Sequence, residues 1–156
     1  MIALAIDPGP TVCGWVRYDP EHQRVVRSGA ADNVPEVLDL IWAVSMIVIA
    51  RVSAQGVAAN SLLQTSEVVG RCWQAAAIRG IPVQLLRRYE VCSALGVSGR
   101  GKDAIVRQRC LEILAGGDAK AARGSKADPG PCYGVAGHAW QALGLALAAE
   151  RLGLLP

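Results

Sequence analysis

The stretch IALAIDPGPTVCGWVRYD, residues 2–19, decides the fold that this sequence predicts. Residues 2–7 form a short apolar run that ends at an Asp-Pro-Gly turn, a pattern typical of a buried strand. Residues 12–19 then favour an antiparallel partner, and residues 23–29 favour a third strand at the edge. The chain therefore begins with a predicted three-stranded meander.

The rest of the sequence alternates helical and strand patterns. Helices are expected over 34–44, 60–79, 88–95, 102–115 and 137–152, and two further strands over 45–50 and 81–86. The run SMIVIA at 45–50 is almost entirely apolar, which favours a central strand buried on both faces. Residues 116–136 are rich in Gly, Pro and Lys and predict a mobile loop. This order predicts one α/β domain over residues 1–156, with a mixed sheet flanked by helices.

Composition limits the class of protein. Of 156 residues, 52% are hydrophobic and 19% are charged, which indicates a folded globular chain. The sequence contains neither a long apolar run nor a secretory signal, so no membrane span or export is expected. The five cysteines are scattered without a CxxC pair, which argues against zinc and disulfides and favours a reducing, intracellular setting.

Basic residues are concentrated in one segment. Residues 87–126 contain nine Lys or Arg and four Asp or Glu. The remaining residues contain seven Lys or Arg and nine Asp or Glu. Such a segment in a nearly neutral protein indicates a surface for a polyanion. A solvated helical face with basic loops is the alternative interpretation.

Several residues could carry chemistry. Asp7 ends an apolar strand, where a carboxylate is costly to bury alone, so it is either a turn residue, a metal ligand or a phosphate-facing group. His138 and Gln141 lie three apart at a helix start and can share a face, although a histidine there is often a capping or surface residue. Lys102 follows the glycine-rich stretch GVSGRGK, whose spacing excludes a Walker A loop but allows a lysine beside a phosphate.

Four stretches in order carry a family resemblance. They are AIDPGPTVCGWVRYD (5–19), IVIARVSAQG (47–56), GKDAIVRQ (101–108) and GHAWQALGLAL (137–147). Together they resemble the RuvC-type Holliday junction resolvases, especially the short forms that bacteriophages encode. The resemblance implies an RNase H-like fold with a five-stranded mixed sheet, and a homodimeric, Mg²⁺- or Mn²⁺-dependent endonuclease. Its substrate would be four-way or other branched DNA, and its location the cytoplasm of a bacterial host.

The resemblance also implies a site. Asp7 would be the first metal ligand, His138 and Gln141 the last ligand pair, and Lys102 a catalytic group near the scissile phosphate. The glutamate that the family carries at the end of strand four falls on Ala50, and Gln141 stands where many relatives have aspartate. Mg²⁺ and Mn²⁺ are hard divalent ions that prefer carboxylate oxygens as ligands. We therefore expect this site to bind two such ions weakly and to be catalytically impaired.

Ala50 has two competing explanations. One is a natural loss that leaves a protein able to bind junctions without cutting them. The other is a deliberate Glu→Ala change, which the otherwise intact pattern around Ala50 favours. A shifted register does not supply the missing carboxylate, because no acidic residue lies between Asp39 and Glu67.

The resemblance and the basic segment predict two interfaces. Phosphates are expected to meet Arg71, Arg87, Arg88, Arg100, Lys102, Arg107 and Arg109. Helix 60–79 corresponds to the dimer element of the family, and its apolar face could be supplied by Leu62, Leu63, Val69, Cys72 and Trp73. These apolar residues could equally pack on the sheet.

Two other functions compete with the nuclease. The first is a non-catalytic module that recognises branched DNA by shape. The second is an actin-like phosphotransferase, suggested by IDPGP at residues 6–10. That fold normally needs two related domains and a second phosphate motif, for which this chain leaves no room.

Overall fold

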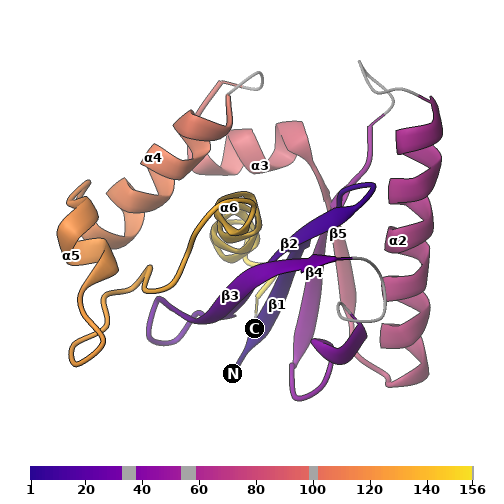
Figure 1. Cartoon of the computed structure of the whole chain (residues 1–156), viewed down its shortest axis with the longest axis horizontal. Helices are drawn as coiled ribbons and strands as arrows, with labels where there is room; N and C mark the ends of the chain where they lie inside the picture. Colours follow the sequence, from indigo (N-terminus) through magenta and orange to yellow (C-terminus); the bar gives the residue numbers. More distant parts are fainter. Residues whose placement is uncertain (33–37, 54–58, 99–101, 156) are drawn as a thin grey trace.

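Figure 1 shows the computed structural model of the chain, which describes residues 1–32, 38–53, 59–98 and 102–155. Its strands are β1 (Ala3–Asp7), β2 (Val12–Asp19), β3 (Arg24–Asp32), β4 (Met46–Arg51) and β5 (Val83–Arg87). They form one sheet in the order β3-β2-β1-β4-β5. β1 and β3 each pair antiparallel with β2, while β4 pairs parallel with both β1 and β5. The predicted meander and mixed five-stranded sheet are therefore confirmed.

Helices cover both faces of this sheet. They are α2 (Ala59–Ile78), α3 (Arg88–Leu95), α4 (Asp103–Ala115), α5 (Ala119–Arg123) and α6 (Ala139–Arg151). Helix α6 lies on one face with α3 and α4 outside it, and α2 lies on the other face (Figure 1). Within the described ranges, no helix combines the length and apolarity that crossing a bilayer requires.

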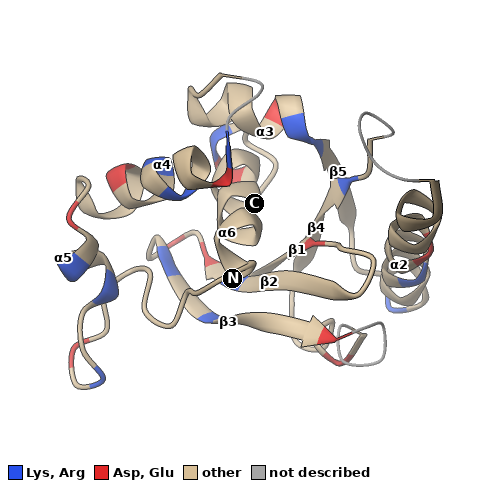
Figure 2. Cartoon of the chain, turned by 45° about the horizontal axis from the view of Figure 1, so that its top comes forward, with Lys and Arg blue, Asp and Glu red and all other residues tan. Residues whose placement is uncertain are grey.

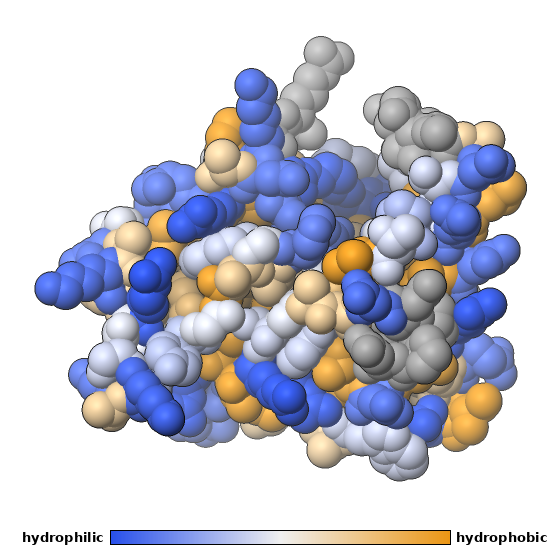
Figure 3. Space-filling view, viewed as in Figure 1, coloured by the Kyte–Doolittle hydropathy of each residue, from blue (hydrophilic) through white to orange (hydrophobic). Residues whose placement is uncertain are grey.

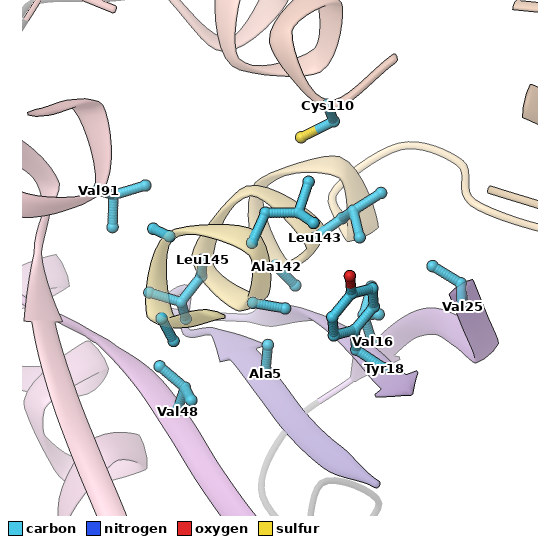
Figure 4. Packing of buried hydrophobic residues seen from close by; sticks show 14 of the residues in the cluster. Ala5, Val16, Tyr18, Val25, Val48, Val91, Cys110, Ala142, Leu143 and Leu145 are labelled. Carbon is cyan, nitrogen blue, oxygen red and sulfur yellow. The ribbon is translucent and has the colours of Figure 1, made fainter. Parts of the chain in front are cut away.

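The face under α6 holds the larger core. Figure 4 shows side chains of α6 between those of the sheet and those of α3 and α4. Labelled members of this cluster are Ala5, Val16, Tyr18, Val25, Val48, Val91, Cys110, Ala142, Leu143 and Leu145. Small residues let the layers approach closely, and a methyl group added at Gly144 would crowd the side chain of Val106 on α4. Helix α6 is thus tightly packed between the sheet and the outer helices.

The opposite face is packed by α2. Leu4 and Ile6 of β1 point to this side, while Ala5 points to α6, so β1 is buried on both faces. Ile47 and Ile49 do the same for β4. The contacting residues of α2 are Val68, Cys72, Ala75 and Ala76. The prediction of a central, doubly buried strand at 45–50 is therefore confirmed for β4.

Two segments differ from the expectation. The predicted loop 116–136 contains helix α5, because the Asp118 carboxylate accepts hydrogen bonds from the backbone N–H groups of Lys120 and Ala121. The loop prediction is wrong over α5, because the glycines before Asp118 favour a loop and the capping role of Asp118 was not recognised. Residues 34–37 of the helix expected over 34–44 lie outside the described residues, and only 38–39 are helical in the remainder.

Candidate functional site

Asp7 and Ala50 lie side by side at one edge of the sheet. The parallel register pairs Ile6 with Ile49, so the next residue of each strand is Asp7 on β1 and Ala50 on β4. β5 runs parallel to β4 and pairs Leu86 with Ala50. The carboxyl ends of three parallel strands therefore meet here, an edge where α/β sheets commonly bind ligands.

A pocket of about 190 Å³ opens at this edge. The residues that line it are Asp7, Pro8, Ala50, Arg51, Val52, Ser53, Thr65, Leu86, Arg88, Val91, Gln141 and Leu145. Three residues that the sequence predicted for the site, Asp7, Ala50 and Gln141, thus meet in one cavity although they come from β1, β4 and α6. Thr65, a buried residue of α2, also lines the pocket, and no motif in the sequence signalled it.

Burial raises the pKa of Asp7 from its ordinary value of 3.8 to about 6. The positive charge of Arg88 lowers the pKa, the carboxylate of Asp103 raises it, and His138 lowers it. Desolvation is the largest of these effects, so the pocket wall is apolar enough to penalise the carboxylate. A carboxyl group shifted in this way inside a cleft is a candidate functional group.

His138 lies close to Asp7 because of Gly14 on β2, a residue that the sequence analysis did not single out. His138 is the residue just before α6, and its side chain is exposed. Gly14 on β2 pairs with Asp7, and a methyl group added at Gly14 would overlap the backbone carbonyl of His138. A glycine inside a predicted strand is the signal that could have indicated this close approach. The start of α6 can therefore sit directly beside Asp7.

Gln141 contacts Arg88, which the sequence had assigned to phosphate binding. The Arg88 Nη1 donates to Gln141 Oε1 at 2.6 Å, and its Nη2 donates to Asp103 Oδ1 at 3.2 Å. The Gln141 Nε2 donates to the backbone carbonyl of Asp103 at 3.3 Å. This second bond fixes the amide so that its oxygen faces the guanidinium. Arg88, the first residue of α3, therefore belongs to the pocket itself.

These residues fit a pair of divalent ions poorly. Among the described residues that line the pocket, Asp7 is the only one with a carboxylate, whereas Arg51 and Arg88 are basic. The Gln141 oxygen already accepts a short hydrogen bond. Mg²⁺ and Mn²⁺ prefer several carboxylate oxygens, and the methyl group of Ala50 supplies none. That this site holds metal weakly remains a prediction.

A larger hollow of about 690 Å³ adjoins this pocket. Asp103, Arg107, His138, Trp140 and Gln141 are among its lining residues, and the Arg107 guanidinium lies over the Trp140 ring, 5.1 Å from its centre. Lys102, also exposed, is the capping residue at the start of α4. In Figure 3, hydrophilic residues predominate over α4 and α5. Predicted phosphate contacts thus border the site.

The other predicted basic contacts are distributed unevenly. Arg87 is exposed and donates to the Tyr89 hydroxyl at 3.2 Å. Arg109 instead donates to the Leu95 carbonyl at 2.7 Å and to Glu112 at 3.0 Å, so it ties α4 to the end of α3. Arg71 lies on α2, over the opposite face of the sheet, and does not join the group on α3 and α4 (Figures 1 and 2). Arg100 lies outside the described residues.

The apolar residues predicted for a dimer divide between two sides of α2. Cys72 is fully buried against the sheet, and Val69 and Leu62 are half-buried. Leu63 is 62% exposed and Trp73 is 50% exposed. The alternative of packing on the sheet is therefore correct for Cys72, while Leu63 and Trp73 remain on the surface.

A second acidic group lies away from the pocket. Oxygen or nitrogen atoms of Asp19, Glu21 and His22 lie within 4.8 Å of one another at the turn after β2. Because β2 runs antiparallel to β1, this turn is at the opposite end of the sheet from Asp7. The Asp19 Oδ2 lies 2.8 Å from His22 Nδ1, so these groups satisfy one another.

Comparison with known proteins places the fold. No family model and no curated protein matches the sequence. A solved structure of RuvC from Thermus thermophilus matches with a TM-score of 0.68 and 20% identity, over 99% of this chain and 98% of that one. The structure described as Thermus thermophilus RuvC in complex with a Holliday junction substrate matches with a TM-score of 0.68 and 18% identity, over 99% and 97%.

The fold class follows from this similarity and from the strand order. The chain has an RNase H-like α/β fold, with a five-stranded mixed sheet flanked by helices. The fold is similar to that of the two RuvC structures over 99% of this chain.

Proposed function

We propose that this protein binds four-way and other branched DNA junctions as a RuvC-type endonuclease domain, and that Ala50 impairs its cleavage centre. The observation that supports this most directly is the pocket shared by Asp7, Ala50 and Gln141. These residues come from the three elements that provide the metal site in the resembling resolvases. The similar structure with a bound Holliday junction supports the choice of substrate class.

Electrostatics support DNA as the partner. Lys and Arg lie at the end of β5, at the start of α3 and along α4 and α5 (Figure 2). Arg87, at the end of β5, and Lys102, at the start of α4, are both exposed, while Arg88 lines the pocket. Contacts of this kind go to phosphates and carry little base information, so recognition would depend on junction shape.

A carboxylate at position 50 would complete the missing part of the site. Mg²⁺ or Mn²⁺, when held by such a site, activates water and stabilises the leaving oxygen of a phosphodiester. The residues of the present chain do not fit that ion pair, so this chain is expected to bind junctions and to cut them slowly or not at all. The substitution Ala50→Glu would place a second carboxylate beside Asp7 and so provide adjacent hard oxygen ligands from two strands.

The test uses one labelled four-way junction and one duplex of equal length. The unsubstituted chain should prefer the junction, and Ala50→Glu should cut it when Mg²⁺ or Mn²⁺ is added. Val26→Glu adds the same charge on the exposed surface of β3, away from the pocket and from α2, and should cut no better than the unsubstituted chain. Asp7→Asn added to Ala50→Glu should abolish cleavage while junction affinity changes little.

The outcomes separate the candidate functions. Junction binding by Ala50→Glu without any cleavage would favour the non-catalytic binding module. Absence of any junction preference in both chains would reject the proposal.

Cutting two opposed strands of a junction needs two copies of the chain. We propose that the exposed Leu63 and Trp73 on α2 form the contact between them. Leu63→Glu should therefore convert a dimer to a monomer in sedimentation.

A further inference from the structure

The pocket beside Asp7 contains a cationic side chain of the protein itself. Its charged lining residues are Asp7, Arg51 and Arg88, and Arg88 is the basic side chain whose charge acts most strongly on Asp7. A pocket for divalent cations would instead be lined by several carboxylates. A phosphodiester is an anion with two oxygens that accept hydrogen bonds, and a guanidinium fork matches such a group.

Arg88 is held in this pocket by its backbone position and by acceptors that include Gln141 and Asp103. It follows β5 immediately and begins α3, so its backbone leaves the sheet at the same edge as Ala50. Gln141 Oε1 accepts from Nη1 at 2.6 Å, and Asp103 Oδ1 accepts from Nη2 at 3.2 Å. Gln141 is in turn oriented by the Asp103 carbonyl. The residue predicted as a metal ligand therefore serves as an orienting acceptor for a cation already present.

We propose that the Arg88 guanidinium is the resident cation of this pocket and that it, rather than a divalent ion, holds the DNA phosphate brought to Asp7. Two features allow a phosphate oxygen to replace Asp103 as an acceptor for Arg88. The Asp103 side chain is 79% exposed, so solvent screens its ion pair with Arg88 and a phosphate oxygen can take its place. Gln141 would keep its bond and preserve the direction of the guanidinium. Arg88 is thus a binding residue, and Gln141 is its positioning residue.

The inference rests on the proposed function, because the phosphate is that of a branched DNA. It also predicts an antagonism. With a glutamate introduced at position 50, the positive charge of Arg88 would oppose a divalent ion entering the same pocket. Junction affinity should therefore depend on Arg88 and should not depend on metal, while metal affinity should rise when Arg88 is removed.

The first measurement is junction affinity in EDTA and in Mg²⁺, over a range of salt concentrations. The unsubstituted chain should bind equally well in both. Arg88→Met should weaken binding by about tenfold in EDTA and reduce the salt slope by about one ion. Arg88→Lys keeps the charge without the planar guanidinium, so its junction affinity should lie between those of the unsubstituted chain and Arg88→Met. Arg24→Met, an exposed residue on β3 far from Asp7, should bind as the unsubstituted chain does.

The second measurement is Mn²⁺ binding without DNA, followed by electron paramagnetic resonance. Adding Arg88→Met to Ala50→Glu should tighten Mn²⁺ binding by about tenfold or more. Adding Arg24→Met to the same background should not. Thermal unfolding of each variant checks that the fold is kept, and Arg88→Lys carries the test if the methionine variant unfolds.

The results that would overturn the inference are specific. They are an unchanged junction affinity and salt slope for both Arg88 variants, Mn²⁺-dependent junction binding by the unsubstituted chain, or equal Mn²⁺ binding with and without Arg88. A chain without any junction preference would instead reject the proposed function. In that case the Mn²⁺ measurement still decides whether Arg88 is the cation of the pocket.

Discussion

Gly14 on β2 lies against the backbone carbonyl of His138 at the start of α6, closely enough that a methyl group would not fit between them. Gly14 also pairs with Asp7 across the sheet. One glycine therefore brings the last helix to the strand end that carries the half-buried Asp7 carboxyl group. The contact involves backbone atoms on both sides, which side-chain rearrangement cannot relieve.

Gly14→Ala should lower the free energy of unfolding by about 1–3 kcal/mol, because the added methyl group must push α6 away from β2. Gly70→Ala is the matched control, since Gly70 lies exposed within α2 with no atom near the added group. That change should stabilise the chain by about 0.5–1 kcal/mol. Urea unfolding measures both, and a Gly14→Ala chain as stable as the original would contradict the close approach.

Asp7→Asn should raise stability at neutral pH. The folded-state pKa of Asp7 is raised to about 6, so the folded chain binds this proton more tightly than the unfolded chain does. The resulting stabilisation is complete below the ordinary pKa of 3.8 and is lost as the pH rises to about 6. An asparagine avoids that loss. The free energy of unfolding of Asp7→Asn, taken relative to the unsubstituted chain, should therefore be about 1–3 kcal/mol higher near pH 7 than near pH 4. Urea midpoints at the two pH values measure it, and a constant difference would contradict the burial of Asp7.

Much of the sheet was predictable because its strands are short, uninterrupted apolar runs. The run before Asp7 and the run before Ala50 must both be buried, and parallel pairing brings their ends to one edge. The two positions could therefore be placed together from the sequence. The helix α5 was missed because its single capping residue, Asp118, lies among glycines that favour a loop.

The roles of the arginines were not predictable in the same way. Arg87 and Arg88 are adjacent in sequence and carry the same charge, yet the first is exposed and the second lines the pocket. Which of them turns inward depends on where β5 ends and α3 begins. Arg109 was equally ambiguous, because its acceptor on Leu95 lies fourteen positions away in the sequence. Long-range acceptors of this kind leave no local pattern.

The five cysteines should be unreactive in the folded protein. All of them are buried, and burial raises the pKa of Cys72 and Cys110 to about 12 and that of Cys132 to about 11. The thiolate is the reactive form, so it is scarce and shielded at neutral pH. Ellman's reagent should react with five thiols after denaturation and with none rapidly before it. A fast native reaction would contradict the packing of that cysteine.

Arg107 and Arg109 lie on the same helix and should separate binding from stability. Arg107 lies over the Trp140 ring at the rim of the larger hollow, where a phosphate could approach it. Arg107→Met should weaken junction binding and lower its salt slope by about one ion, with little change in unfolding.

Arg109→Met removes the bonds to Leu95 and Glu112 instead, and should cost about 1–2 kcal/mol of stability. Its salt slope for junction binding should stay that of the unsubstituted chain, because its donors already face the protein. Binding titrations at several salt concentrations and urea unfolding of both variants make the comparison. If Arg109→Met lowered the salt slope as much as Arg107→Met, Arg109 would be a phosphate contact as the basic segment first indicated, and its bond to Leu95 would have to open on DNA.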